Sequence, residues 1–260
     1  MIIGINNENF EGGVINQMVK SYGLKVIQSG NVIEVYEYKN PVLQGYSDKR
    51  KTVKGRQAVA NEEDKETNRD KVLQRARKNV RRIINANIQK HSKFLTLTFK
   101  ENIQDIPQAN KEFMLFIKRL SYHLGYKVQY TAVVEFQERG AIHFHVLLYN
   151  VLEKLDLNWL SQIWSNGFIN LKSIKDVDNV GAYVCKYMTK CEDEVKLRGK
   201  KMYFNSRGLN KPVEIKEPEL VRPLVESLQV ETPKYSNTFE NDYNSINYKQ
   251  YIIKDYKDKL

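Results

Sequence analysis

Cysteine and long hydrophobic runs are scarce in this chain of 260 residues. The two cysteines, Cys185 and Cys191, are too few for a disulfide framework, and their spacing differs from the Cys-x-x-Cys pairs of zinc knuckles. No apolar run approaches the roughly 18 residues that span a bilayer, and the first residues lack the basic and apolar regions of a secretory leader. These absences predict a protein of the reducing cytoplasm that has no membrane partner.

Acidic residues are outnumbered by basic ones. The chain holds 42 lysines and arginines against 31 aspartates and glutamates, which gives a net charge of +11 and a pI near 9.4. Such a balance favours a polyanionic partner, usually nucleic acid, over a basic protein without such a partner. Most of the excess lies between Lys49 and Arg82, where 13 basic and 5 acidic residues give 13 − 5 = +8. Hydrophobic residues make up 41%, which is enough for a folded core.

The first third of the chain changes from a strand pattern to a helix pattern. Residues 24–38 predict two short strands that meet in a turn at Ser29-Gly30-Asn31. From about residue 61 to residue 87, apolar side chains recur at steps of three and four and predict an amphipathic helix. The remaining surface of this helix carries Arg75, Lys78, Arg81 and Arg82. We interpret this surface as a DNA-binding face that follows phosphates, and the alternative is a solvated face of a packed helix.

Alternating strand and helix patterns fill the middle of the chain. We expect strands over residues 94–99, 128–136, 141–149, 168–171 and 201–205, and helices over residues 109–124, 155–164 and 180–190. This order predicts an α+β fold in which helices flank an antiparallel sheet. From Lys216 onward the chain is polar, with 7 basic and 8 acidic residues, and we expect a loosely attached tail. The predicted organisation is an N-terminal β-hairpin region (1–48), a basic amphipathic helix (49–90), a central domain (91–212) and a polar C-terminal tail (213–260).

Two of the four histidines predict a metal site. His143 and His145 stand two apart in a predicted strand, so their side chains share one face. If residues 138–140 form a three-residue hairpin loop with its glycine left-handed, Glu135 lies directly opposite His143. Two imidazoles and a carboxylate placed in this way can bind one divalent ion. A two-residue loop would shift the register, and Glu138 would then be the alternative ligand. The other interpretation is a pair of histidines that bind no metal.

A tandem Tyr-x-x-Lys pattern follows in the predicted helix of residues 180–190. Tyr183 and Tyr187 are four residues apart, which places them one turn apart on one helix face, and Lys186 and Lys190 each follow a tyrosine by three residues. A phenol is a poor nucleophile at neutral pH because its pKa is near 10. Neighbouring lysines, and a metal that polarises a phosphate, lower that barrier. The plainer interpretation is an amphipathic helix whose tyrosines pack on the sheet.

These elements occur in the order typical of the HUH endonuclease superfamily. The chain resembles, in particular, rolling-circle replication initiators of small plasmids and single-stranded DNA phages. The resemblance is carried by Phe94-Leu-Thr-Leu-Thr98, His143-Phe-His145 and the tandem Tyr-x-x-Lys, and it covers about residues 91–210. Two tyrosines four residues apart are similar to the two-tyrosine phage and plasmid type. A Walker A motif is absent from the sequence, unlike in viral initiators with a fused helicase.

The resemblance implies a ferredoxin-like or RRM-like HUH core and a nicking-joining enzyme. The implied ligands of Mg²⁺ or Mn²⁺ are Glu135, His143 and His145. The implied catalytic residues are Tyr183 and Tyr187 as nucleophiles, with Lys186 and Lys190 stabilising negative charge in the transition state. Attack would leave a 5′-phosphotyrosine and a free 3′-hydroxyl that primes a polymerase. The implied partners are single-stranded DNA at a replication origin and the host helicase and polymerase.

Three other functions fit parts of the sequence. A mobilisation relaxase of the same superfamily would use the same site, but its tyrosine often lies near the N-terminus, whereas the tyrosines here follow the histidines. A non-catalytic DNA-binding regulator would have a broken site, and every expected position is filled. A zinc deaminase would need His-x-Glu and Pro-Cys-x-x-Cys elements, which the sequence lacks. The order of the motifs therefore favours a replication initiator.

Overall fold

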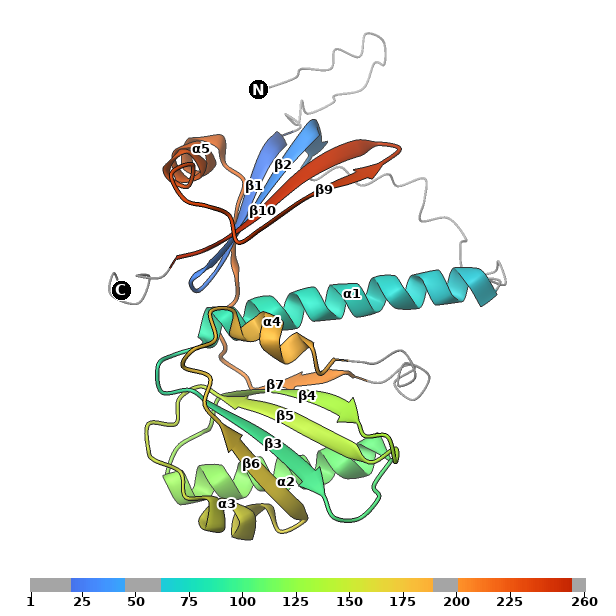
Figure 1. Ribbon diagram of the computed structural model, residues 1–260, viewed down its shortest axis with the longest axis vertical. Helices are drawn as coiled ribbons and strands as arrows, with labels where there is room; N and C mark the ends of the chain where they lie inside the picture. Colours follow the sequence, from blue (N-terminus) through green and yellow to red (C-terminus); the bar gives the residue numbers. More distant parts are fainter. Residues whose placement is uncertain (1–19, 45–61, 189–200, 254–260) are drawn as a thin grey trace, which may run out of the picture. The chain divides into compact units, whose positions relative to one another are not determined.

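The structure is a computed structural model that describes residues 20–44, 62–188 and 201–253. The chain divides into two compact units: unit 1 combines residues 1–69 with residues 213–260, and unit 2 is the continuous stretch Asp70–Pro212. The described residues form five helices and ten strands, and the strands lie in two antiparallel five-stranded sheets (Figure 1). The predicted α+β class, with helices beside an antiparallel sheet, is confirmed. No helix among these residues is long and apolar enough to cross a membrane.

The sheet of unit 2 contains all the strands predicted for the middle of the chain. Its strands are β3 (Lys93–Phe99), β4 (Tyr130–Phe136), β5 (Ile142–Leu148), β6 (Gly167–Lys172) and β7 (Tyr203–Asn205). They lie in the order β6-β3-β5-β4-β7. In β3, β4 and β5 successive side chains point to opposite faces of the sheet, and both faces carry buried residues. Helices therefore cover this sheet on both sides.

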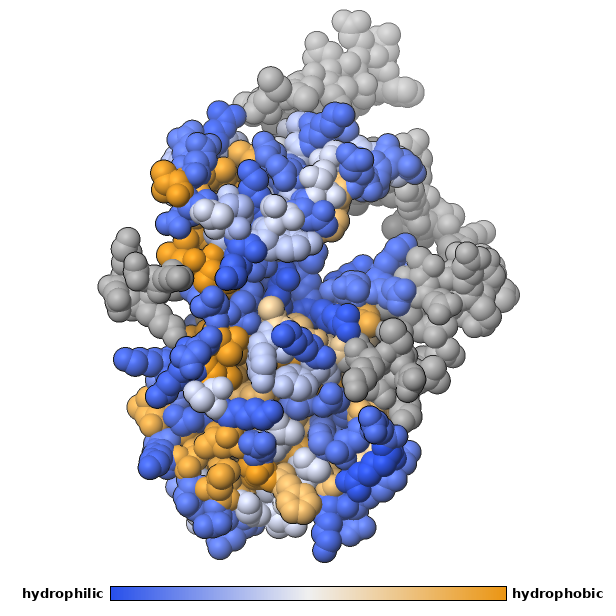
Figure 2. Space-filling model, viewed as in Figure 1, coloured by the Kyte–Doolittle hydropathy of each residue, from blue (hydrophilic) through white to orange (hydrophobic). Residues whose placement is uncertain are grey.

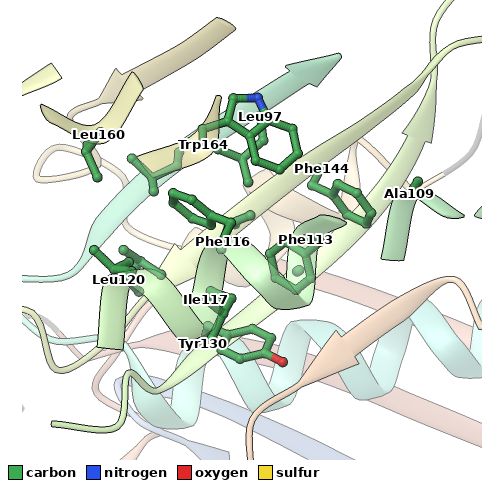
Figure 3. Close-up of a cluster of buried hydrophobic side chains, with 14 of the residues drawn as sticks. Leu97, Ala109, Phe113, Phe116, Ile117, Leu120, Tyr130, Phe144, Leu160 and Trp164 are labelled. Atoms are coloured by element: carbon green, nitrogen blue, oxygen red, sulfur yellow. The ribbon is translucent and has the colours of Figure 1, made fainter. Parts of the chain in front are cut away.

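One face of the unit 2 sheet packs against α2 (Ile106–Leu124) and α3 (Leu157–Trp164). The buried stripe of α2 includes Phe113 and Leu120, as its apolar spacing predicts. The Phe113 ring stacks on Phe144 of β5, with centroids 4.8 Å apart, and large buried side chains fill the rest of this core (Figure 3). Close packing of this kind makes the sheet a rigid support for whatever its opposite face carries.

The opposite face of the same sheet packs against α1 (Glu62–Asn87) and α4 (Val180–Cys185). The described part of α1 buries an apolar stripe at the predicted spacing. The cluster on this face consists of Val80, Ile84, Phe94, Val133, Leu147, Tyr149, Ile174, Val180, Val184 and Met188. Along the central strands these apolar side chains give way to polar ones. The polar end of this face forms the candidate site.

Unit 1 differs from the expected hairpin and loose tail. The predicted hairpin is present as β1 (Ser21–Ser29) and β2 (Val32–Leu43), with Gly30 left-handed at φ 58° in the turn. The tail expectation is wrong for the described residues, which form β8 (Val213–Ile215), α5 (Pro218–Ser227), β9 (Tyr235–Asn241) and β10 (Asn244–Ile252). These strands join the hairpin in the order β8-β1-β2-β10-β9. Polar composition misled the prediction, because strands that are half exposed or at a sheet edge need few apolar residues.

The visible surface is largely hydrophilic, and hydrophobic side chains gather mainly at one end of unit 2, over α3 and β6 (Figure 2). Phe168 of β6 and Leu157 of α3 are among the exposed large hydrophobic residues there. Scattered exposed apolar residues are ordinary on a protein surface.

Candidate metal and tyrosine site

Three neighbouring strands place the polar side chains of the site on one sheet face. In β5, His143 and His145 alternate with buried Phe144, which points into the α2 core. On one side, β3 pairs Thr96 with His145; on the other, β4 pairs Glu135 with His143. Because directly opposed residues in antiparallel strands face the same way, these side chains converge on the face that α1 and α4 cover.

The turn between β4 and β5 has the predicted three-residue form. The Gln137 N–H donates to Ala141 O at 2.8 Å, and the Gly140 N–H donates to Gln137 O at 2.7 Å. Gly140 has a φ of 85°, the left-handed conformation that favours glycine. The Arg139 guanidinium donates to the carbonyl of Phe99 at 2.7 Å and ties the turn to the end of β3. The predicted register, with Glu135 opposite His143, is therefore confirmed.

Glu135, His143 and His145 form a group that could hold a metal ion, with their ligand atoms all within 4.8 Å of one another. The Glu135 carboxylate leans diagonally and lies 2.5 Å from His145 Nε2, although its strand partner is His143. His143 Nε2 is buried and has no hydrogen-bond partner among the described residues. An unpaired buried donor or acceptor is costly, so this nitrogen fits a ligand position. Glu138, the alternative ligand, is exposed in the turn and lies outside the group.

The environment of the histidines favours neutral imidazoles, which are the metal-binding form. Burial lowers the pKa of His143, and the neighbouring His145 lowers this pKa further. His145 lies with Nδ1 at 3.2 Å from Thr96 Oγ1, and its exposed fraction is only 4%. A hydroxyl oxygen can accept a hydrogen bond from Nδ1–H, which leaves the Nε2 lone pair directed at the metal position. Thr96 thus orients one ligand of the group.

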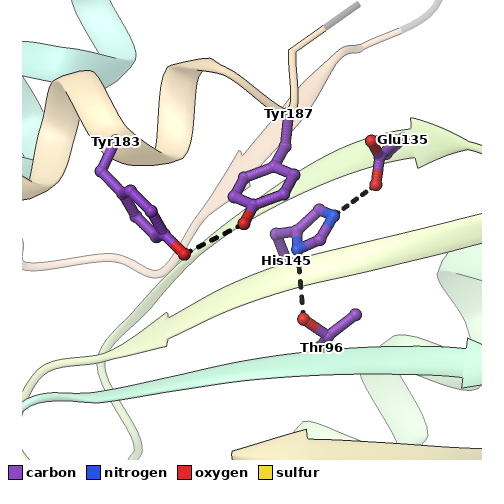
Figure 4. Close-up of polar contacts among 5 residues, drawn as sticks. All are labelled: Thr96, Glu135, His145, Tyr183 and Tyr187. Atoms are coloured by element: carbon purple, nitrogen blue, oxygen red, sulfur yellow. Dashed lines mark hydrogen bonds and ion pairs between the residues drawn. The ribbon is translucent and has the colours of Figure 1, made fainter. Parts of the chain in front are cut away.

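The two tyrosines lie against this group (Figure 4). The Tyr187 ring stacks on the imidazole of His145, with centroids 3.8 Å apart and planes 23° apart. Its hydroxyl donates to the Tyr183 hydroxyl at 3.1 Å. Burial raises the pKa of Tyr187 to about 12, and the hydrogen bond to Tyr183 and the charges of Tyr183 and Glu135 act in the same direction. Both phenols therefore stand beside the candidate metal ligands, and Tyr187 is the closer to His145.

The tyrosine helix is shorter than predicted. We expected a helix over residues 180–190, but α4 ends at Cys185, so Tyr187 lies in the turn that follows it. In this turn the N–H of Tyr187 donates to Val184 O at 3.0 Å, a tighter step than in an α-helix. Lys186 is exposed, with Nζ 5.8 Å from the centre of the Tyr183 ring. Lys190 lies outside the described residues.

Helix α1 fixes α4 and the following turn. The Asn85 side chain accepts from the Gly181 N–H at 2.8 Å and donates to Asn179 Oδ1 at 2.9 Å. A Cβ at Gly181 would lie 2.2 Å from the carbonyl oxygen of Arg81, so the close approach of the two helices requires glycine. Arg77 donates through Nε and Nη2 to Met188 O, at 3.1 and 2.6 Å. The tyrosines are therefore held from the side of α1.

A basic groove runs between α1 and α4. Its lining residues are Gln74, Arg77, Lys78, Arg81, Ala182, Cys185 and Lys186. Of the four predicted DNA-binding cations of α1, Lys78 and Arg81 line this groove, whereas Arg75 and Arg82 do not. The prediction did not include Thr96, Arg77 and Asn85 among the site residues. Thr96 could have been inferred from the Leu-Thr-Leu-Thr alternation, but the other two depend on the helix packing.

Fold and site together define an α+β protein with a candidate metal group beside a tyrosine pair. Residues 92–192 match the model of a family described as replication-associated protein ORF2. This range contains the three candidate metal ligands and both tyrosines, and the match supports a replication initiator family. No curated protein and no solved structure matches the chain.

Proposed function

We propose that this protein is a replication initiator of the two-tyrosine HUH type, which nicks and rejoins single-stranded DNA at an origin. The observation that carries the proposal is the convergence of Glu135, His143 and His145 with Tyr183 and Tyr187 on one sheet face. The match of residues 92–192 to a replication-associated family supports the same role.

The candidate ligands suit a divalent ion such as Mg²⁺ or Mn²⁺, because two imidazoles and a carboxylate accept either. Glu135, His143 and His145 would hold the ion, and the orphaned Nε2 of His143 provides one of the donor atoms. When bound, the ion would supply Lewis-acid polarisation of the scissile phosphate. Thr96 would keep the His145 ring in the orientation that ligation needs.

The reaction is a transesterification by a tyrosine. The phenolic oxygen of Tyr183 or Tyr187 forms a bond to phosphorus, and the bond from phosphorus to the 3′ oxygen breaks. The phenol loses its proton, the 3′ oxygen gains one, and the 5′-phosphate remains on the protein as a phosphotyrosine. The attack of a later 3′-hydroxyl on this ester rejoins the strand. A second tyrosine next to the first allows two successive transfers without release of the DNA.

Basic residues would neutralise the phosphates. Lys186 beside Tyr183 would stabilise charge on the reacting phosphate, and Lys190 is proposed for the same role from its sequence position. Lys78 and Arg81 in the groove, with Arg75 and Arg82 elsewhere on α1, would bind the flanking strand. The free 3′-hydroxyl would prime a host polymerase, and a host helicase would open the duplex.

The proposal is tested with random-sequence single-stranded oligonucleotides labelled at the 3′ end. Cleavage by a tyrosine transfers the labelled fragment to the protein, so a labelled protein band should form with Mn²⁺ and be absent with EDTA. His143→Ala and His145→Ala should abolish the band but change the DNA affinity little. Tyr122→Phe serves as a control, because Tyr122 is 84% exposed on α2. A double histidine variant that still cleaved at the original rate in EDTA would refute the metal assignment.

A further inference from the structure

The two faces of the unit 1 sheet have different chemistry. One face is aliphatic: Val26, Ile33 and Val35 pack against Val221 and Leu228 of α5 and its end. The other face carries a cluster of Ile27, Tyr36 and Tyr248 with Tyr38 and Ile246, and all of these residues belong to strands. Within the part of unit 1 that the structure describes, no helix contributes to this second cluster.

The strand register places further aromatic residues on the second face. Across the sheet, Tyr36 of β2 pairs with Tyr248 of β10, and Ile246 pairs with Phe239 of β9. Tyr235 lies four residues before Phe239 in β9, so both point to this same face. We call this surface the tyrosine face; it comprises Tyr22, Lys25, Tyr36, Tyr38, Tyr235, Phe239 and Tyr248.

The aromatic rings of the tyrosine face form one continuous layer. The Tyr248 ring lies at its centre, with its centroid 5.0 Å from that of Tyr36, 5.9 Å from Tyr235 and 6.1 Å from Phe239. Tyr248 is only 6% exposed, whereas Tyr235 is 50% and Phe239 49% exposed. The central rings are therefore supports, and the β9 rings offer accessible aromatic surface.

Polar groups on this face fix the rings and leave it receptive to anions. The buried Glu34 accepts hydrogen bonds from the hydroxyls of Tyr248 at 2.9 Å and Tyr36 at 3.3 Å, which holds both rings in place. Lys25 Nζ lies over the Tyr36 ring, 4.8 Å from its centre, as in a cation–π contact. Lys216 Nζ lies 5.0 Å from the centre of the Tyr22 ring. Positive charge thus stands beside the aromatic layer, while the Glu34 carboxylate is engaged beneath it.

We propose that the tyrosine face binds single-stranded DNA by stacking unpaired bases on Tyr235 and Phe239. Aromatic rings on an open sheet with cations beside them suit unpaired bases and the phosphates that join them. A face built to be covered by a helix of this protein has aliphatic residues, as the α5 side shows. The choice of DNA as the polymer rests on the proposed function, but the face shares no residue with the metal and tyrosine site.

The test is binding of a fluorescent oligothymidylate to the full chain in EDTA, where cleavage does not contribute. Tyr235→Ala and Phe239→Ala should each weaken binding about tenfold or more, because stacking of one base on an aromatic ring is worth at least that much. Tyr235→Phe keeps the ring and should bind like the original protein. Tyr243→Ala is the matched control, since Tyr243 is 85% exposed but lies in the turn between β9 and β10.

Circular dichroism of each variant separates misfolding from loss of stacking, and Tyr235→Phe keeps the test decisive if an alanine variant unfolds. Equal affinity in the alanine variants and the control would overturn the proposal. A concentration-dependent dimer that Tyr235→Ala disrupts, with DNA binding unchanged, would assign the face to a second copy of the chain instead. His143→Ala should retain oligothymidylate binding, so failure of the nicking proposal would be distinguished from failure of this one.

Discussion

At the scale of single residues, the contact between Thr96 and His145 predicts an effect on metal affinity. Thr96→Val removes the hydroxyl that lies 3.2 Å from His145 Nδ1, and loss of such a supporting contact commonly weakens a metal site about 10- to 100-fold. We expect Thr96→Val to weaken Mn²⁺ binding by about tenfold or more and Thr96→Ser to preserve it. Calorimetric titration of the protein with Mn²⁺, without DNA, measures this.

Thr98→Val is the matched control for this prediction. Thr98 lies on the same strand and pairs with His143, but its side chain makes no hydrogen bond to a described residue. Equal losses of Mn²⁺ affinity in Thr96→Val and Thr98→Val would show that the Thr96 hydroxyl has no special role.

The order in which the tyrosines act is also decided by single residues. Family members with one tyrosine resemble this chain at Tyr183, and the pKa of Tyr187 is raised to about 12, which makes its phenol harder to ionise. We therefore expect Tyr183→Phe to remove most of the covalent adduct and Tyr187→Phe to impair chiefly the second transfer. Mass spectrometry of the digested adduct identifies the modified peptide. An adduct found on Tyr187 alone would reverse the order.

At the scale of elements, the crossing of α1 and α4 depends on Gly181. A side chain there would meet Arg81 O at 2.2 Å and Asn85 Oδ1 at 2.8 Å. We expect Gly181→Ala to lower the free energy of unfolding of unit 2 by roughly 1–3 kcal/mol, as overpacking does, and to reduce the adduct yield. Urea denaturation followed by the fluorescence of Trp164 measures the first effect.

Gly23→Ala provides a comparison for this prediction. Its added Cβ would meet nothing nearer than the carbonyl oxygen of Tyr38, at 3.9 Å. A Gly181→Ala protein as stable and as active as Gly23→Ala would show that the helices can separate without cost.

The basic surface of α1 predicts a salt effect. Binding to single strands should weaken as salt rises, with log K falling by about 0.7 per log unit of salt for each phosphate neutralised. Replacing Lys78 and Arg81, which line the groove beside α4, should reduce this slope more than replacing Arg75 and Arg82, which do not. Filter binding between low and moderate salt measures both slopes. Identical slopes in all variants would mean that this surface is only solvated.

The elements also mark what sequence alone could predict. The β4–β5 register followed from one turn, because a glycine in the third position of a three-residue loop fixes the pairing of Glu135 with His143. The end of α4 could not be predicted in this way. Its apolar spacing continues beyond Cys185, but Arg77 binds Met188 O and Tyr187 stacks on His145. Both contacts come from residues far away in the sequence.

The long-range pairing in unit 1 was hidden for a similar reason. β9 is exposed along its whole length, so its composition resembles that of a loop. Its place is set by pairing with β10, which in turn pairs with β2 more than 200 residues earlier. A local pattern carries no signal for such a partner, whereas the adjacent hairpin strands β1 and β2 announce theirs through the turn.

At the scale of the whole molecule, the two units should differ in their dependence on the last part of the chain. A two-stranded hairpin is at most marginally stable alone, and the aliphatic core of unit 1 needs Val221, Leu228 and Tyr251. We expect a chain ending at Pro212 to lose amide-exchange protection in β1 and β2 but to keep it in β3, β4 and β5. Hydrogen exchange with mass spectrometry measures this. Persistent protection of the shortened hairpin would contradict the prediction.

The pairing of β2 with β10 also has a consequence for synthesis on the ribosome. Val32 is translated 252 − 32 = 220 residues before its partner Ile252, which at typical elongation rates is an interval on the order of ten to forty seconds. Unit 2 is continuous and is complete in the nascent chain before β9 and β10 are made. The hairpin therefore waits with its β2 edge open while the unit with the candidate metal ligands can already fold, and the tyrosine face is assembled last.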